Sequence, residues 1–146
     1  MKKFIITIGR QFGSGGREIG KRVAQELGIG YYDKELLAVA AEESGLSLEY
    51  LEEKDEKRAT HFLHSLTIGY PYSVWGSGEL PVEQLAVQAQ RNAVLSVAEK
   101  GSCVIVGRCA DVILADRDDV VSIFISADME QRVLHVKERD GVAEGE

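Results

Sequence analysis

The sequence predicts an α/β fold built on a mostly parallel sheet. Strand patterns and helix patterns alternate along the chain, and the apolar runs are short and rich in β-branched residues. Runs of this kind are typical of strands covered on both faces, and strands separated by helices pair in parallel. The chain has 146 residues, 45% of them hydrophobic. That length suffices for one domain with a core and is too short for two ordinary domains.

Four segments are expected to be strands, and the helices fall between them. The expected strands are residues 3–9, 31–32, 102–108 and 119–126. Residues 17–27 place Ile19, Val23 and Leu27 on one apolar stripe, which predicts a helix that ends at Gly28. Four further helices are expected. Two begin at Asp33 and at Ser47, which serve as their N-caps, one covers residues 82–100, and the last begins near Asp128.

Composition excludes several classes of protein. The net charge of −7 disfavours a nucleic-acid binder with a broad basic face, and no apolar stretch is long enough to cross a membrane. Cys103 and Cys109 match neither a disulfide framework nor a zinc signature, so a reducing cytoplasm is the expected compartment. His61 and His64 have no evident third ligand beside them, and no metal site is expected.

The most informative segment is the glycine-rich turn at residues 9–17, between the first strand and the first helix. In a parallel sheet such a turn lies at the carboxyl ends of the strands, where ligands bind. Glycines let backbone N–H groups converge on an anion, and the helix N-terminus adds partial positive charge. Phosphate is therefore the expected guest. The alternative is a tight turn that only lets the helix pack on the strand.

The turn departs from the standard phosphate-loop pattern, G-x-x-x-x-G-K-[ST]. In that pattern the lysine binds the terminal phosphates and the hydroxyl binds magnesium. Here Gly16 stands at the lysine position, and Arg17 and Glu18 follow it. The dinucleotide-binding pattern G-x-G-x-x-G also fails, because its third glycine would fall on Glu18.

A short-chain dehydrogenase remains as an alternative from another class. Its pattern G-x-x-x-G-x-G fits Gly9, Gly13 and Gly15, and Tyr50 and Lys54 have the spacing of its Tyr-x-x-x-Lys pair. That pair lies too early in the chain for this family, however, and the chain is too short for its fold.

Two long segments, IITIGRQFGSGGREIGKRVAQELGIGYYDKELL and SCVIVGRCADVIL, resemble the cytidylate kinase-like family of the P-loop nucleoside-monophosphate kinases. The matching features are the Gly-Ser-Gly-Gly loop, Asp33, the pair Gly107-Arg108 followed by Asp111, and a helix with Arg132 and Arg139. The resemblance implies a P-loop three-layer αβα sandwich over residues 1–146 as a single domain. It also implies a helical acceptor-binding insert at about 45–81 and a lid region that is incomplete at the C-terminus.

The resemblance implies roles for the residues of the donor side. The loop residues Gly13, Ser14, Gly15 and Gly16 would hold the β-phosphate of ATP through their N–H groups. Arg17 is the nearest cation that could replace the missing lysine.

On the acceptor side, the resemblance places Asp33 near the acceptor phosphate and Mg2+, where a carboxylate can hold the metal or polarise the attacking oxygen. Arg108 would contact the acceptor phosphate, together with Arg91 and Asp111. Arg132 would stabilise charge on the transferring phosphoryl group.

The implied activity is transfer of the γ-phosphoryl group of ATP, with Mg2+, to a nucleoside monophosphate, cytidylate-like, or to a related small acceptor. The expected partner is a small-molecule nucleotide, and apolar residues at 66–75 suggest a homodimer. The alternative is a catalytically degenerate member that binds nucleotide as a sensor or partner-binding module. Gly16 and the incomplete lid favour that alternative.

Overall fold

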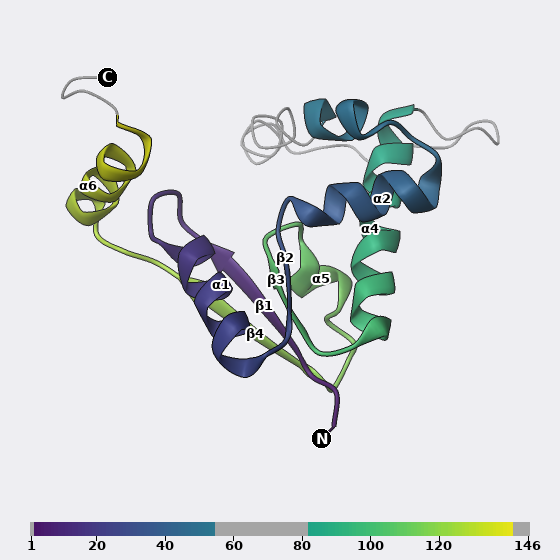
Figure 1. Cartoon of the computed structure of the whole chain (residues 1–146), viewed down its shortest axis with the longest axis horizontal. Helices are drawn as coiled ribbons and strands as arrows, with labels where there is room; N and C mark the ends of the chain where they lie inside the picture. The colour runs from purple at the N-terminus through teal and green to yellow at the C-terminus, as the bar shows by residue number, and fades with distance from the viewer. Residues whose placement is uncertain (1, 55–81, 142–146) are drawn as a thin grey trace, which may run out of the picture. The chain divides into compact units, whose positions relative to one another are not determined.

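The computed structural model describes residues 2–54 and 82–141, and within them the predicted α/β class is confirmed. Four parallel strands form one sheet flanked by helices (Figure 1). The strands are β1 (Ile5–Arg10), β2 (Gly30–Tyr32), β3 (Cys103–Val106) and β4 (Val120–Ile125), in the order β2-β3-β1-β4. Each lies within a segment that the sequence predicts to be a strand or at most one residue outside it.

Strand β1 lies between β3 and β4, and its Ile5 pairs with both Cys103 and Val120. Because all four strands run in the same direction, their carboxyl ends meet at one edge of the sheet. The segments that follow β1, β2 and β3 therefore start at this edge.

Helix α1 (Gly16–Leu27) packs against the sheet through a cluster of buried side chains. That cluster consists of Ile8, Ala24, Val104 and Val106. A Cβ at Gly20 would lie 3.0 Å from both the Cδ1 of Ile8 and the Cγ2 of Val106. The glycine thus lets the helix approach the strands closely, which holds the start of α1 near the end of β1.

The chain divides into two compact units, residues 34–93 and the remainder. The remainder holds the sheet, α1, α5 (Ala110–Ile113), α6 (Met129–Asp140) and the last turns of α4 (Val82–Lys100). The other unit holds α2 (Glu35–Ser44), a helical turn at 48–54 and the first part of α4, with Leu36, Ala40 and Leu51 buried. The single domain and the insert at 45–81 stay predictions, since most of that insert lies outside the described residues.

Of the two predicted N-caps, one is confirmed and one is wrong. The hydroxyl of Ser47 accepts a hydrogen bond from the N–H of Tyr50 at 3.1 Å, as a cap should. Lys34, not Asp33, occupies the N-cap position of α2. The carboxylate of Asp33 is engaged by arginines instead, as described below. The short helix α5 was not expected.

Strand β4 departs from the expectation that strands are covered on both faces. It pairs with β1 alone among the described strands, and Val121 and Phe124 are 55% and 66% exposed. Cys103, by contrast, is buried, as its position in an apolar run predicts. Within the described ranges, no helix combines the length and apolar character that a membrane span requires.

Candidate functional site

The turn between β1 and α1 is shaped by two glycines in left-handed conformation. Gly13 has φ 78° and Gly15 φ 80°, a region that side chains with a Cβ rarely adopt. The N–H of Ser14 donates to the carbonyl of Gln11 at 3.1 Å, which closes the turn. Gly15 then occupies the N-cap of α1, so the free N–H groups of the first helical turn open at the edge of the sheet.

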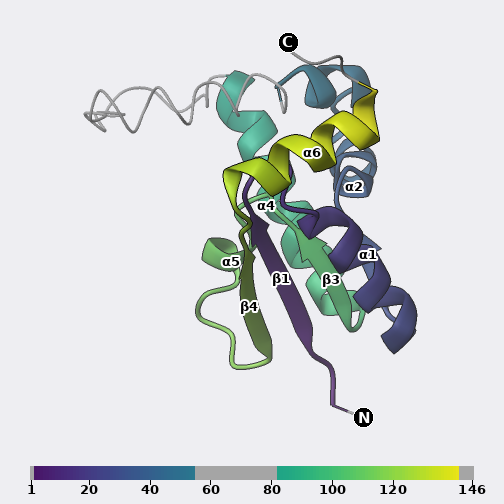
Figure 2. The ribbon, with the colours of Figure 1, turned by 90° about the vertical axis from the view of Figure 1, so that its left-hand side faces the viewer.

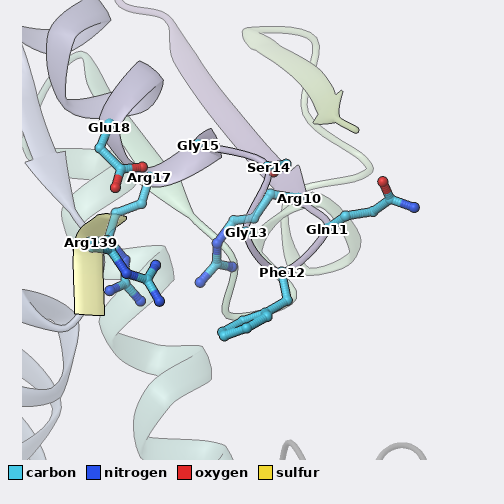
Figure 3. A pocket seen from close by; sticks show the side chains of 10 residues that line it. Arg10, Gln11, Phe12, Gly13, Ser14, Gly15, Arg17, Glu18 and Arg139 are labelled. Carbon is cyan, nitrogen blue, oxygen red and sulfur yellow. The ribbon is translucent and has the colours of Figure 1, made fainter. Parts of the chain in front are cut away.

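This loop borders an open hollow of about 280 Å³. Its lining is formed by residues 10–18 together with Arg139. In Figure 3 the guanidinium groups of Arg10, Arg17 and Arg139 extend to the same side of the loop. Ligand pockets usually measure about 300–1,000 Å³, so the hollow suits the phosphate end of a nucleotide better than a whole nucleotide.

A hydroxyl in the loop lacks a hydrogen-bond partner. The Oγ atom of Ser14 is buried, and within the described residues it neither donates nor accepts a hydrogen bond. An unsatisfied buried hydroxyl costs free energy, and a phosphate oxygen in the loop would relieve that cost by accepting a hydrogen bond from it.

Helix α6 lies across the carboxyl ends of the strands (Figure 2) and against the loop. Arg132 donates from its Nε to the carbonyl of Ala127 at 3.1 Å and from Nη1 to the carbonyl of Phe12 at 3.4 Å. A Cβ on Gly13 would lie only 2.8 Å from the backbone oxygen of Arg132. The side chain expected to touch the phosphoryl group therefore ties α6 to the loop backbone.

The arginine of α6 that lines the hollow is Arg139. Its guanidinium also lies 5.6 Å from the ring centre of Phe12. The family resemblance includes Arg139 as a residue of this helix but implies no role for it in the site. The signal was present, because residues seven apart, such as Arg132 and Arg139, lie on the same face of a helix.

A carboxylate, Glu18, also lines the hollow and contacts α6. Its Oε1 lies 3.3 Å from Nε2 of His135. Partial burial raises the pKa of Glu18, but hydrogen bonds from its own backbone N–H and from His135 outweigh this effect and bring the pKa below 4.5. Glu18 is therefore ionised at neutral pH. Neither Glu18 nor His135 is among the site residues that the sequence predicts.

A second cluster of charges lies beside the loop, at the ends of β2 and β3. The Nε atom of Arg17 lies 2.6 Å from Oδ2 of Asp33, and Nη2 of Arg108 lies 3.4 Å from Oδ1. The side chains of Asp33 and Arg108 are only 5% and 9% exposed, whereas that of Arg17 is 44% exposed. The structure thus brings together three residues that the sequence predicted for the site.

The turn that carries Arg108 is strained. Gly107, Arg108 and Cys109 have φ values of 68°, 61° and 54°, all left-handed. This conformation costs roughly 1–2 kcal/mol for a residue with a Cβ. Strain of this kind concentrates at functional sites, and here it directs Arg108 toward Asp33.

Two other predicted residues lie on helices α4 and α5. Arg91 is exposed on α4 and belongs to the other compact unit. Asp111 is exposed in the first turn of α5. His61 and His64, and the apolar segment 66–75, lie outside the described residues.

The described side chains do not fit a directly bound Mg2+. Among them no group of three or more His, Cys, Asp or Glu could hold a metal ion. Both oxygens of Asp33 face arginines, and Arg17 stands where the standard loop has a hydroxyl that binds magnesium. Glu18, the other carboxylate near the loop, contacts His135.

Comparison with known proteins identifies the family. The profile described as "Cytidylate kinase-like family" matches residues 5–146, and the chain belongs to this family. This membership favours the phosphate-loop interpretation over the short-chain dehydrogenase.

Among solved structures, the chain is similar to an uncharacterized protein from Eubacterium ventriosum ATCC 27560, with 32% sequence identity and a TM-score of 0.64. The match covers 97% of this chain and 65% of the other, so this chain spans less than two thirds of that protein's length. No protein of curated function matches significantly.

Proposed function

We propose that this protein is an ATP-dependent phosphotransferase that moves the γ-phosphoryl group to a nucleoside monophosphate, cytidylate-like, or to a related small acceptor. One observation carries the proposal: Arg17 lines the glycine-loop hollow and also pairs with Asp33 in the neighbouring charge cluster. Two candidate phosphate sites, one for the donor and one for the acceptor, thus share a side chain at one edge of the sheet. Family membership supports a kinase of this general type.

The local charge supports an anionic ligand. The chain as a whole is acidic, with a net charge of −7. Around the hollow and the adjacent cluster, however, four guanidinium groups face three carboxylates, one of which is Asp140, paired with Arg139 at 2.7 Å. The residues concerned are Arg10, Arg17, Arg108, Arg139, Asp33, Glu18 and Asp140. Such a local excess of positive charge attracts phosphates within a protein that otherwise repels polyanions.

We assign the following roles. The N–H groups of the loop and of the first turn of α1 would bind the β-phosphate of ATP. Arg108 would bind the acceptor phosphate, and Arg17 would stabilise charge between the two phosphates. Because both oxygens of Asp33 face arginines, we assign it the role of orienting Arg17 and Arg108 rather than of taking a proton.

Mg2+ would arrive with ATP, held by its phosphates, since the described side chains do not fit the ion. Arg91, Asp111 and Arg132 remain proposed contacts of the acceptor and of the transferring phosphate. A homodimer and a cytoplasmic location are likewise proposed.

The test is titration of the chain with ATP, with and without Mg2+, followed by an assay of ADP release with each common nucleoside monophosphate. Binding and turnover with one acceptor would establish the activity and name the substrate. Absence of ATP binding would refute the proposal. The variant Arg17→Ala should lower kcat, because the charge shared by the two phosphate sites is removed.

A second candidate function is nucleotide binding without turnover. It is favoured by Gly16, which leaves the loop without its lysine, and by the engagement of both oxygens of Asp33 with arginines. Tight ATP binding without ADP release, with every acceptor tested, would support this alternative. In that case Arg17→Ala would weaken binding, with no turnover to lose.

A further inference from the structure

The chain departs from the standard phosphate loop at two positions, and each position has the type of residue that the pattern has at the other. When Gly15 is aligned with the second glycine of G-x-x-x-x-G-K-[ST], the first glycine falls on Arg10 and the lysine on Gly16. The chain therefore has an arginine where the pattern has glycine, and a glycine where it has the cation.

The structure explains the glycine at position 16 by the arginine at position 10. Gly16 is not among the glycines with positive φ, so its backbone would accept a side chain. Space is what a side chain would lack. A Cβ on Gly16 would lie 2.6 Å from the Cβ of Arg10, 3.2 Å from its Cγ and 3.4 Å from its Cδ. The stem of Arg10 occupies the volume that the lysine stem would need.

The head group of Arg10 lies farther along the same edge of the sheet. Its Nη1 would lie 2.6 Å from a Cβ on Gly107, the residue that precedes Arg108. The side chain thus runs from the glycine loop to the turn after β3, and it lines the hollow. The guanidinium of Arg10 makes no ion pair or hydrogen bond with the described residues. By contrast, the Nε atom of Arg17 lies 2.6 Å from Oδ2 of Asp33.

We propose that Arg10 is the phosphate-binding cation of this loop, in place of the lysine, and that Gly16 is glycine to let its stem pass. The inference rests on the proposed function, since it requires a polyphosphate in the loop. It replaces the expectation that Arg17 fills the lysine's role. A guanidinium binds phosphate oxygens through two parallel N–H···O hydrogen bonds. A lysine at position 10 should therefore replace the arginine only in part.

The experiment measures the affinity of the full chain for ATP and for inorganic tripolyphosphate by calorimetry. Arg10→Met keeps an unbranched apolar stem and removes the charge. We expect it to lower the affinity for both ligands about ten- to a hundredfold. Arg22→Met is the matched control, because Arg22 is an exposed arginine of α1 that pairs with Glu26 outside the hollow. Its affinity should stay close to that of the unaltered chain.

A second set of variants tests the packing of the stem. Gly16→Ala should weaken binding although every charge is retained, because the new Cβ displaces Arg10. Gly101→Ala is its control, since nothing lies within 4 Å of a Cβ there and its φ is not positive. The double variant Arg10→Ala/Gly16→Lys returns the cation to the standard position, and it should bind better than Arg10→Ala alone.

The outcomes separate this inference from the proposed function. If the unaltered chain binds ATP and Arg10→Met, folded by circular dichroism, binds it equally well, the assignment of Arg10 is wrong and the proposed function stands. If Gly16→Ala retains full affinity, the packing argument is wrong. If the unaltered chain binds neither ATP nor tripolyphosphate, the proposed function itself fails.

Discussion

The Nε atom of Arg17, in the first turn of α1, lies 2.6 Å from the Oδ2 atom of Asp33, directly after β2. Arg108, after β3, approaches the other oxygen of the same carboxylate. Since Arg17 also lines the loop hollow, this ion pair connects the loop to the neighbouring strand ends. A change at any one of these side chains should therefore affect both parts of the site.

The first prediction concerns the stability of this cluster. Asp33→Asn removes the carboxylate from two arginines, one of which is nearly buried. Loss of one partner of a buried ion pair costs about 3 kcal/mol, and we expect the free energy of unfolding in urea to fall by about that amount. Glu26→Gln, which breaks the exposed pair with Arg22, should cost below about 1 kcal/mol. Equal losses for the two variants would contradict a structural role for Asp33.

The second prediction concerns the strained turn after β3. Cys109 is exposed and has φ 54°, so Cys109→Gly should relieve roughly 1–2 kcal/mol of strain. The added flexibility of the unfolded chain offsets part of this gain, which leaves a net stabilisation of about 0.5–1 kcal/mol. Cys109→Ala keeps the Cβ and should bring no gain. Urea unfolding under reducing conditions compares the free energies of unfolding of the two variants. If the Gly variant is no more stable than the Ala variant, the claim of strain at Cys109 is wrong.

The third prediction uses the difference between the two thiols. Burial raises the pKa of Cys103 from 9.0 to about 11, whereas Cys109 is exposed. Iodoacetamide at about pH 8 should therefore modify Cys109 alone in the folded chain, and both cysteines in urea, as read by mass spectrometry. Modification of Cys103 under native conditions would show that the strand opens.

The same pKa shift predicts a loss of stability in alkali. Well below pH 9.0 the thiol of Cys103 is neutral in both the folded and the unfolded state. Between pH 9.0 and about 11 the unfolded thiol ionises and the folded one does not, so the free energy of unfolding falls as the pH rises. Unfolding at about pH 8 and about pH 10 measures the slope. Cys103→Ala should have a smaller slope, and an unchanged slope would contradict this account.

The fourth prediction concerns the carboxylate in the hollow. Glu18 carries a negative charge beside the proposed phosphate site, so Glu18→Gln should tighten ATP binding about two- to fivefold at moderate salt. Glu26→Gln on the same helix changes the net charge equally and should have a smaller effect. Because the pKa of Glu18 lies below 4.5, the repulsion should persist unchanged through neutral pH. Weaker binding by Glu18→Gln would instead indicate that the contact with His135 shapes the site.

Patterns along the chain were sufficient to predict most of the fold. Apolar runs predicted three of the four strands and the pair Tyr31-Tyr32 predicted the other, and a long periodic segment predicted α4 over 82–100, where it lies. These features depend on local spacing, which a single sequence displays. The exposure of β4 could not be predicted in this way, because its apolar residues look like those of β3 and only its position at the edge of the described sheet distinguishes them.

The candidate site, too, could be predicted from the sequence only in part. By itself the sequence determined that a glycine-rich turn follows a strand, that Arg108 lies at the carboxyl end of another, and that the chain resembles a kinase family. Only the tertiary structure decided which charges meet: Asp33 between Arg17 and Arg108, Arg139 in the hollow, and Arg10 over Gly16. The physical reason is that most of these contacts join segments far apart in the chain, while the contact of Arg10 with Gly16 depends on how the loop between β1 and α1 folds. Their distances depend on strand order and helix packing, which spacing along the sequence does not encode.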